Sequence, residues 1–290
     1  MKKLEYILHL FMYELEKFLL TKKNELVNIA YQSDEANTDR PLKEYLKYIL
    51  EKYSDDIILS TKVGFVNLKN SEVKLDIENF KILSVLLPEN INEDIKRMVK
   101  KQKNNNVYTN PDICLKILYD GQIYYETIEL KSTKSNIIPG SSVRQILPEE
   151  WVIFIKHSKL DIDIATGKYV NSINSRIQFP DRSPRPQVSF EELKKWNEKN
   201  RRVENLTLYY NALDDEKDKY FLITDWQAFL TEKWIDMLLN SSSVKNREPW
   251  FNNNMRKFII KFLNYYDTLN KEQQEKLKRN ISSLIKNDDY

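Results

Sequence analysis

The sequence predicts a mixed α/β fold, in which a central mixed sheet is flanked by helices and followed by a largely helical C-terminal region. Two strand-like runs, Asp112 to Tyr119 and Gln122 to Lys131, are joined by Asp120-Gly121, a strong signal for a two-residue hairpin turn. The apolar run from Trp151 to Ile155 is typical of a buried strand, of the kind that parallel sheets contain. Helical patterns dominate from Asp225 to the end of the chain.

Two helices are predicted near the start of the chain. The segment from Leu4 to Leu20 places seven apolar residues on one helical face, and Glu14 and Glu16 interrupt it, so we expect neither a signal peptide nor a membrane span. A second helix begins near Pro41, because proline is well suited to the first turn, with Thr38 or Asp39 as its cap. Its inward residues are Leu42, Tyr45, Leu46, Ile49 and Leu50.

Further elements are expected on both sides of the hairpin. β-Branched and apolar content predicts strands over Ile57 to Val66 and Val73 to Ile77, and a basic amphipathic helix over Asn90 to Lys103. A short helix is expected from Gly140 to Leu147, and a second hairpin from Leu160 to Val170 around Thr166-Gly167. The remaining expectations are an irregular loop from Phe179 to Gln187 and a helix capped by Ser189 that runs to Asn200.

We divide the chain into residues 1–225, which hold the core with its N-terminal helices and inserted loops, and a helical region over 226–290. We expect the second region to pack on the first rather than to be independent.

Composition excludes several kinds of site. The chain of 290 residues has only 4 Gly, and the nearest two are Gly121 and Gly140, so neither a P-loop nor a dinucleotide-binding fingerprint can be formed. One Cys and 2 His exclude a disulfide framework and a cysteine-rich zinc site. Any metal must be a hard cation held by carboxylates, which means Mg²⁺ or Mn²⁺. We expect a reduced, cytoplasmic protein without a membrane span.

The residues at one end of the predicted hairpin can carry chemistry. Asp112 begins the first strand, and Glu129 and Lys131 end the second on one side of the sheet, because side chains alternate along a strand. If the hairpin is in register, two carboxylates converge there with an ammonium group beside them. Such a set can hold a divalent cation and orient a water molecule for attack on a phosphodiester.

At Pro111-Asp112 and Glu129-Leu130-Lys131 the sequence resembles the PD-(D/E)xK nuclease superfamily, to which many type II restriction endonucleases belong. The family core runs helix, three strands, helix, strand, which is the order predicted between Pro41 and Ile155. The resemblance is specific over about Asn110 to His157. It implies that Asp112 and Glu129 bind Mg²⁺ (with Mn²⁺ as a substitute) and that Lys131 positions and activates the attacking water.

A second acidic-x-Lys sequence competes with this site. Glu72-Val-Lys74 follows Asp55 by the same seventeen residues that separate Asp112 from Glu129, and Asp56 is one residue closer. Only the Glu129 copy has Pro-Asp ahead of it, a hairpin turn between, and a predicted helix and buried strand behind. In the remaining interpretation all these groups are solvated charges at strand ends.

Several accessory residues are candidates. Glu44, or else Glu51, could add a carboxylate to the metal site, although an exposed charge on an amphipathic helix is the competing interpretation. A helix beginning at Ser141 would favour an anion, and arginine suits bidentate contact with guanine. The candidates for DNA contacts are Lys134, Ser141, Arg144, Gln145, Arg182 and Arg185, with Gln145 alternatively near the catalytic groups.

The sequence therefore predicts a Mg²⁺-dependent, sequence-specific double-stranded DNA endonuclease, a type II restriction enzyme. A symmetric target implies a homodimer, and the resemblance implies a cognate DNA methyltransferase that protects the host. The alternatives are another nuclease on the same core, either a repair nicking enzyme or a junction resolvase, and a non-catalytic DNA-binding module.

Overall fold

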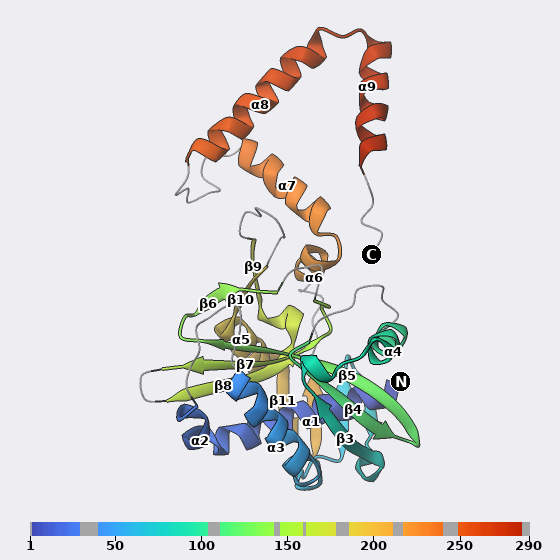
Figure 1. The fold of residues 1–290 in the computed structure, drawn as a ribbon, viewed down its shortest axis with the longest axis vertical. Coiled ribbons are helices and arrows are strands. Elements are labelled where there is room, and N and C mark those ends of the chain that lie inside the picture. Colours follow the sequence, from blue (N-terminus) through green and yellow to red (C-terminus); the bar gives the residue numbers. More distant parts are fainter. Residues whose placement is uncertain are drawn as a thin grey trace. The chain divides into compact units, whose positions relative to one another are not determined.

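The computed structural model describes residues 2–29, 40–103, 111–141, 146–158, 161–177, 186–210, 217–239 and 249–285 (Figure 1). The chain is a mixed α/β protein that divides into two compact units, Met1–Thr224 and Asp225–Tyr290. In the described part, no helix is long and apolar enough to cross a membrane.

The described residues of the first unit form three sheets. The largest has the strand order β3-β4-β5-β7-β8, in which β5 and β7 are parallel and the other neighbours are antiparallel. Its strands are β3 (Phe80–Leu86), β4 (Ile113–Tyr119), β5 (Gln122–Thr133), β7 (Trp151–His157) and β8 (Ile162–Lys168). A four-stranded sheet has the order β11-β12-β1-β2, and its strands are β1 (Phe65–Leu68), β2 (Ser71–Lys74), β11 (Arg201–Glu204) and β12 (Thr207–Tyr210). A small third sheet, ordered β6-β10-β9, is formed by β6 (Ile137–Pro139), β9 (Ile173–Ile177) and β10 (Pro186–Ser189).

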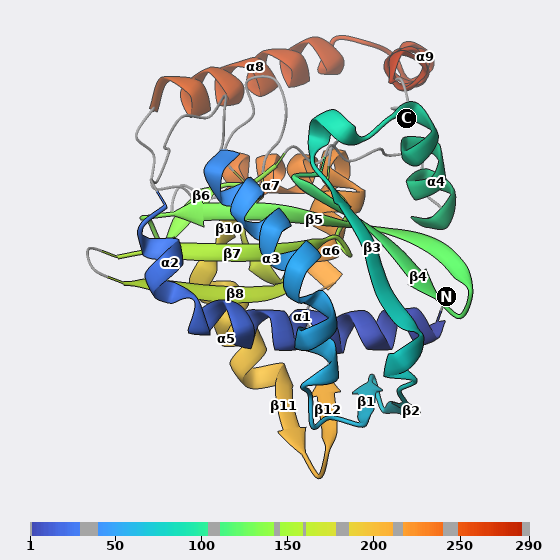
Figure 2. The same cartoon turned by 60° about the horizontal axis from the view of Figure 1, so that its bottom comes forward.

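Helices cover the five-stranded sheet. Figure 2 shows α1 (Lys2–Thr21) and α3 (Arg40–Leu59) across one of its faces, and the two helices share one large apolar cluster with the sheet. Residues of α4 (Glu93–Lys103) pack in a separate cluster with Cys114 and Tyr125. The other helices in the described part of this unit are α2 (Lys23–Val27), α5 (Phe190–Asn200) and α6 (Lys217–Thr224), with 3₁₀ turns η1 (Ile77–Asn79), η2 (Pro88–Asn90) and η3 (Tyr169–Ser172).

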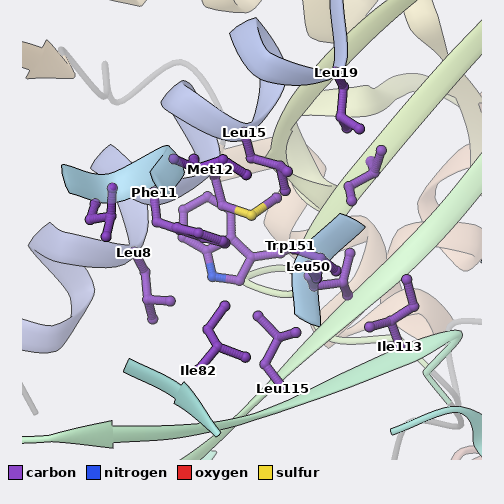
Figure 3. Packing of buried hydrophobic residues seen from close by; sticks show 14 of the residues in the cluster. Leu8, Phe11, Met12, Leu15, Leu19, Leu50, Ile82, Ile113, Leu115 and Trp151 are labelled. Atoms are coloured by element: carbon purple, nitrogen blue, oxygen red, sulfur yellow. The ribbon is translucent and has the colours of Figure 1, made fainter. Parts of the chain in front are cut away.

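The core lies between α1, α3 and the sheet. Figure 3 shows Phe11, Met12 and Leu15 of α1 packed near the indole of Trp151 on β7, and all four side chains are almost fully buried. Truncating an aromatic side chain in such a core to alanine typically costs about 3–5 kcal/mol of stability. This packing holds the middle strands of the sheet in place.

The second unit is helical, as its sequence pattern predicts. Its described residues include the helices α7 (Trp226–Leu239), α8 (Pro249–Asp267) and α9 (Lys271–Leu284). Asn270 begins α9 with a capping box, in which its side chain accepts from the Gln273 backbone N–H and the Gln273 side chain accepts from the Asn270 backbone N–H.

Several sequence predictions are confirmed. Both N-terminal helices form, and Leu42, Leu46, Ile49 and Leu50 are buried as expected, while Tyr45 is half-buried. The helix predicted over Asn90 to Lys103 is α4, and Ser189 caps α5 by accepting from the Glu192 backbone N–H. Thr38 and Asp39, the candidate caps of α3, lie outside the described residues.

The predicted strand over Ile57 to Val66 is wrong. Ile57 and Ile58 are buried residues of α3, and β1 begins only at Phe65. The helical spacing of apolar residues continues from Leu46 through Ile57, and it prevails over the strand preference of β-branched side chains. The strand predicted over Val73 to Ile77 is displaced, because β2 ends at Lys74 and Ile77 begins the 3₁₀ turn η1.

Strand β3 was not predicted. Its register with β4 shifts between Ile82 and Ser84, which is a β-bulge or irregularity, so its buried residues do not alternate regularly. The hairpin predicted at Thr166-Gly167 is also wrong, because both residues lie inside β8, which pairs with β7 from Trp151 opposite Lys168 to His157 opposite Ile162. Gly167 instead allows Leu193 of α5 to approach closely, since an added Cβ would lie 2.7 Å from the Leu193 Cδ1.

Two predicted segments fall largely outside the described residues. Of the short helix predicted from Gly140 to Leu147, residues 142–145 are not described, and Gly140, Ser141, Ile146 and Leu147 are not helical. Of the irregular loop predicted from Phe179 to Gln187, only its last two residues are described, and they belong to β10.

Candidate active site

The β4–β5 hairpin brings Asp112 to the end of the sheet that carries Glu129. Its turn residues Asp120 and Gly121 have φ angles of 49° and 74°, the left-handed conformation that a type I′ turn requires. The register runs from Tyr119 opposite Gln122 to Ile113 opposite Ile128. Continued by one residue, this register puts Asp112 opposite Glu129, as the sequence predicts.

Packing of the neighbouring residues fixes the direction of Glu129 and Lys131. Ile128 and Leu130 belong to the large core cluster on the α1–α3 side of the sheet. Because side chains alternate along a strand, Glu129 and Lys131 lie together on the opposite face. Both are largely shielded from solvent, with side-chain exposures of 11% and 14%.

The end of β5 carries a compact hydrogen-bonded group. The Lys131 Nζ lies 2.7 Å from the Glu129 Oε1 and donates to the Ser141 Oγ at 2.9 Å. The Ser141 hydroxyl in turn donates to the same Glu129 oxygen. Ser141, predicted as a DNA contact, therefore contacts both the carboxylate and the ammonium group of the predicted site.

A buried tyrosine holds Ser141 in place. The backbone N–H of Ser141 donates to the phenolic oxygen of Tyr169 at 2.8 Å. Burial of this ring raises the pKa of Tyr169 to about 12, so the phenol is neutral near pH 7. Sequence reasoning missed Tyr169, because it lies in η3, well beyond the hairpin, and no local pattern connects it to Glu129.

A second lysine, Lys43, is also part of the group. Its Nζ lies 2.6 Å from the Asp112 Oδ1, and the two side chains are only 14% and 16% exposed. The other Asp112 oxygen, Oδ2, accepts from the backbone N–H of Leu130 at 2.8 Å. Sequence analysis missed Lys43, although its neighbour Glu44 was considered for this site.

The charges at the site influence one another. Burial and the nearby charge of Glu129 raise the pKa of Asp112, while Lys43 opposes this shift. Burial alone would lower the pKa of Lys131, but the neighbouring Glu129 raises it overall, so Lys131 is an ammonium group. Asp112, Glu129 and Lys131 are thus close enough to interact electrostatically with one another.

The donor set fits a hard divalent cation. Among the described residues no group of three or more His, Cys, Asp or Glu is arranged to hold a metal ion. Mg²⁺ does not require such a cage, because it commonly uses one or two carboxylates together with water and substrate phosphate oxygens. Asp112 and Glu129 are the residues that would hold it here.

The structure gives the additional carboxylate candidates other partners. Glu44 is exposed and pairs with Arg40, with 2.6 Å between the Glu44 Oε1 and the Arg40 Nε. Glu51 lies 3.8 Å from Lys47 and accepts from the Val85 backbone N–H at 3.4 Å.

The predicted DNA-contacting residues are only partly described. Lys134 is exposed, one residue after the end of β5. Arg144, Gln145, Arg182 and Arg185 lie outside the described residues.

The competing acidic-x-Lys set is not assembled on a strand pair. Asp55 and Asp56 are exposed residues of the helix α3. Glu72 and Lys74 are exposed on β2, in the four-stranded sheet. This context lacks the paired strands that bring Asp112 to Glu129.

Comparison of the sequence with models of known protein families and with curated proteins finds no match.

Proposed function

We propose that this protein is a Mg²⁺-dependent, sequence-specific double-stranded DNA endonuclease of the PD-(D/E)xK superfamily, acting as a type II restriction enzyme. The observation that carries the proposal is the meeting of Asp112, Glu129 and Lys131 at one end of the β4–β5 hairpin. The residues form one partly buried group of opposite charges, which is what hydrolysis of a phosphodiester requires.

The arrangement of the sheet also supports this family. The helix α3 precedes the antiparallel strands β3, β4 and β5, and β7 then pairs in parallel with β5. This agrees with the order helix, three strands, helix, strand if β1, β2, α4 and β6 are counted as insertions. The region of the second helix includes undescribed residues 142–145.

Each residue has a chemical role in the proposed reaction. Asp112 and Glu129 would hold Mg²⁺, and the bound ion would supply charge neutralisation at the scissile phosphate and a lower pKa for its bound water. Lys131, fixed between Glu129 and Ser141, orients the water that attacks phosphorus. A bond forms between the water oxygen and phosphorus, the bond to the leaving oxygen breaks, and a proton passes to that oxygen.

The helical second unit supports a homodimer, the simplest assembly for cutting both strands of a symmetric site. None of the described side chains of α8 and α9 is buried. Large apolar residues are instead exposed on both helices: Phe258, Ile260, Leu263, Tyr265, Ile281 and Leu284. Such exposed apolar surface is typical of a protein–protein interface.

The proposal has consequences for the setting of the enzyme. A restriction enzyme acts in the cytoplasm, where thiols are reduced, and the single cysteine of the chain, Cys114, is buried. A cognate DNA methyltransferase would protect the host genome, with no direct contact between the two proteins implied.

Cleavage of a sequenced plasmid tests the function. We expect discrete fragments in Mg²⁺ or Mn²⁺, no cleavage in EDTA, and no cleavage by Asp112→Asn, Glu129→Ala or Lys131→Ala, with DNA binding largely retained. Mapping the fragment ends gives the recognition sequence. Full activity in all three variants would contradict the assignment, nicks without sequence preference would indicate a repair or resolvase activity, and binding without cleavage would indicate a non-catalytic module.

A further inference from the structure

Lys43 and Asp112 form an unusually shielded ion pair. Among ion pairs between described residues, three have both side chains less than a fifth exposed: Lys43–Asp112, Lys131–Glu129 and Arg201–Glu16. Two of these three meet at the candidate active site. Removing charges from water is costly, so such a pair is stable only if its mutual attraction and its hydrogen bonds offset that cost.

Lys43 differs from its basic neighbours on α3 in the partner that it contacts. Arg40 and Lys47, its basic neighbours on α3, pair with Glu44, Glu89 and Glu51 at the surface, where all these side chains are about a third or more exposed. Lys43 alone of the three reaches the end of the sheet and contacts the predicted metal-binding carboxylate.

Both oxygens of Asp112 are therefore occupied by protein donors. Oδ2 accepts from the Leu130 N–H at 2.8 Å, and Oδ1 lies 2.6 Å from the ammonium group of Lys43. The backbone amide cannot leave without disturbing β5, whereas a lysine side chain can swing away on its flexible stem. Oδ1 is thus the oxygen that can become free for another cation.

The charge balance of the site leads to the same conclusion. Two carboxylates, Asp112 and Glu129, are matched by two ammonium groups, Lys43 and Lys131. Adding a divalent cation to this neutral set would create an excess of positive charge in a partly buried site, unless one ammonium group withdraws or a phosphate enters.

We propose that Lys43 is an internal counter-cation that competes with the divalent metal for the Oδ1 of Asp112 until DNA binds. Release of Asp112 by Lys43 frees the ligand for the metal, and the freed ammonium group is then available to a DNA phosphate. The DNA-free protein therefore binds metal weakly. This inference rests on the proposed metal site at Asp112 and Glu129, and it makes Lys43 a positioning residue rather than a metal ligand.

Mn²⁺ binding to the full-length, DNA-free protein tests the inference, followed by the loss of the free-ion electron paramagnetic resonance signal. We expect Lys43→Met to bind Mn²⁺ at least about tenfold more tightly than the wild type. Close charge pairs have coupling free energies that correspond to a tenfold or larger change in affinity. Lys43→Arg keeps the charge and should remain close to the wild type. Lys47→Met, on the same helix but in a surface pair, is the matched control and should not change the affinity.

A double variant locates the bound ion. Lys43→Met combined with Asp112→Asn should lose the gain in affinity, because the competed ligand is gone. Thermal melting provides a second readout: Mn²⁺ should raise the melting temperature of Lys43→Met more than that of the wild type. If Lys43→Met does not fold, Lys43→Gln replaces it.

The outcomes separate the two proposals. Equal or weaker Mn²⁺ binding by Lys43→Met, with binding still abolished by Asp112→Asn, would overturn the role of Lys43 and leave the metal site intact. Binding that is indifferent to Asp112→Asn in every background would overturn the metal site itself, and the role of Lys43 with it.

Discussion

The Oγ of Ser141 accepts a hydrogen bond from the Lys131 Nζ at 2.9 Å and donates to the carboxylate of Glu129. One hydroxyl group thus links the two predicted catalytic side chains. Ser141 is held by its own backbone N–H, which donates to the Tyr169 hydroxyl oxygen. Tyr169 is almost fully buried, so a side chain from the core sets the position of the active-site groups through Ser141.

Removing the Ser141 hydroxyl should slow DNA cleavage without weakening DNA binding. Ser141→Ala leaves Lys131 and Glu129 without their common partner, and loss of such an outer contact typically costs about 10–100-fold in activity. Single-turnover cleavage at saturating DNA measures the effect. Ser141→Thr retains a hydroxyl and should recover much of the rate, which a purely structural role for the residue would not explain. Equal rates for Ser141→Ala and the wild type would contradict the role assigned to Ser141.

Substitutions in the two acidic-x-Lys sequences should have opposite outcomes for DNA cleavage: loss at Glu129 and Lys131, and little change at Glu72 and Lys74. Glu129→Gln and Lys131→Met should abolish cleavage, because both side chains belong to the shielded group at the end of β5. The matched substitutions Glu72→Gln and Lys74→Met change exposed side chains of β2 and should leave the cleavage rate within about twofold, as is usual for surface positions. The same plasmid assay compares all four variants, and loss of cleavage in the β2 pair alone would reverse the assignment.

The central hairpin was predictable because its signals are local. Asp120-Gly121 specifies the turn, the turn fixes the register, and the register brings Asp112 to Glu129. The parallel strand β7 was likewise visible as a continuous apolar run, which a strand buried on both faces requires.

The partners of the site were not predictable in the same way. Lys43 lies on α3, far ahead of the hairpin in the sequence, and Tyr169 begins η3 directly after β8. Their contacts with Asp112 and Ser141 depend on how α3 and η3 pack against the sheet, and no spacing in the sequence encodes that packing. Strand β3 was missed for a different reason, since its irregular register hides the alternation that identifies a strand.

Gly140 should be the least replaceable of three glycines. A Cβ at Gly140 would lie 2.6 Å from the carbonyl oxygen of Pro186 and closer still to the Tyr169 hydroxyl, so Gly140→Ala should destabilise the protein by about 1–3 kcal/mol. It should also reduce cleavage, because the Tyr169 hydroxyl holds Ser141. At Gly167 the nearest atom is the end of the flexible Leu193 side chain, so Gly167→Ala should cost less.

Gly64 is the control for this series. No atom lies within 4 Å of a Cβ added there, and its φ is not positive, so Gly64→Ala should range from no change to a gain of about 1 kcal/mol. Urea unfolding of the three variants measures the order. A Gly140→Ala protein as stable as Gly64→Ala would show that the contacts around Tyr169 adjust without cost.

His9 should make the stability of the protein depend on pH below about 6.5. Its ring is buried against Trp151 and Tyr210, at centroid distances of 4.8 and 4.4 Å, and the Nδ1 forms no hydrogen bond with a described residue. Burial, aided by the positive charges of Lys168 and Arg201, lowers the pKa of His9 well below its usual value of 6.5. Below pH 6.5 the unfolded chain therefore binds a proton that the folded protein does not, and folding is disfavoured.

The pH effect has a defined sign and size. The contribution of His9 is fully present above pH 6.5 and is lost, at about 1.4 kcal/mol per pH unit, as the pH falls toward the folded-state pKa. His9→Leu removes the titrating group, so the difference in unfolding free energy between the variant and the wild type should change with pH over this range. Urea unfolding at several pH values measures it, and a constant difference would contradict a buried neutral His9.

The exposed apolar residues of α8 should determine the oligomeric state. Phe258 and Leu263 are 64% and 50% exposed, so changing both to Glu leaves no cavity in the protomer but places charges in a proposed dimer interface. Light scattering after size-exclusion chromatography should show a dimer for the wild type and a monomer for Phe258→Glu/Leu263→Glu. Asn264→Glu adds a charge to an exposed polar position of the same helix and is the control. Because a monomer holds one active site, the double variant should release nicked plasmid before linear plasmid, and an unchanged dimer would place the interface elsewhere.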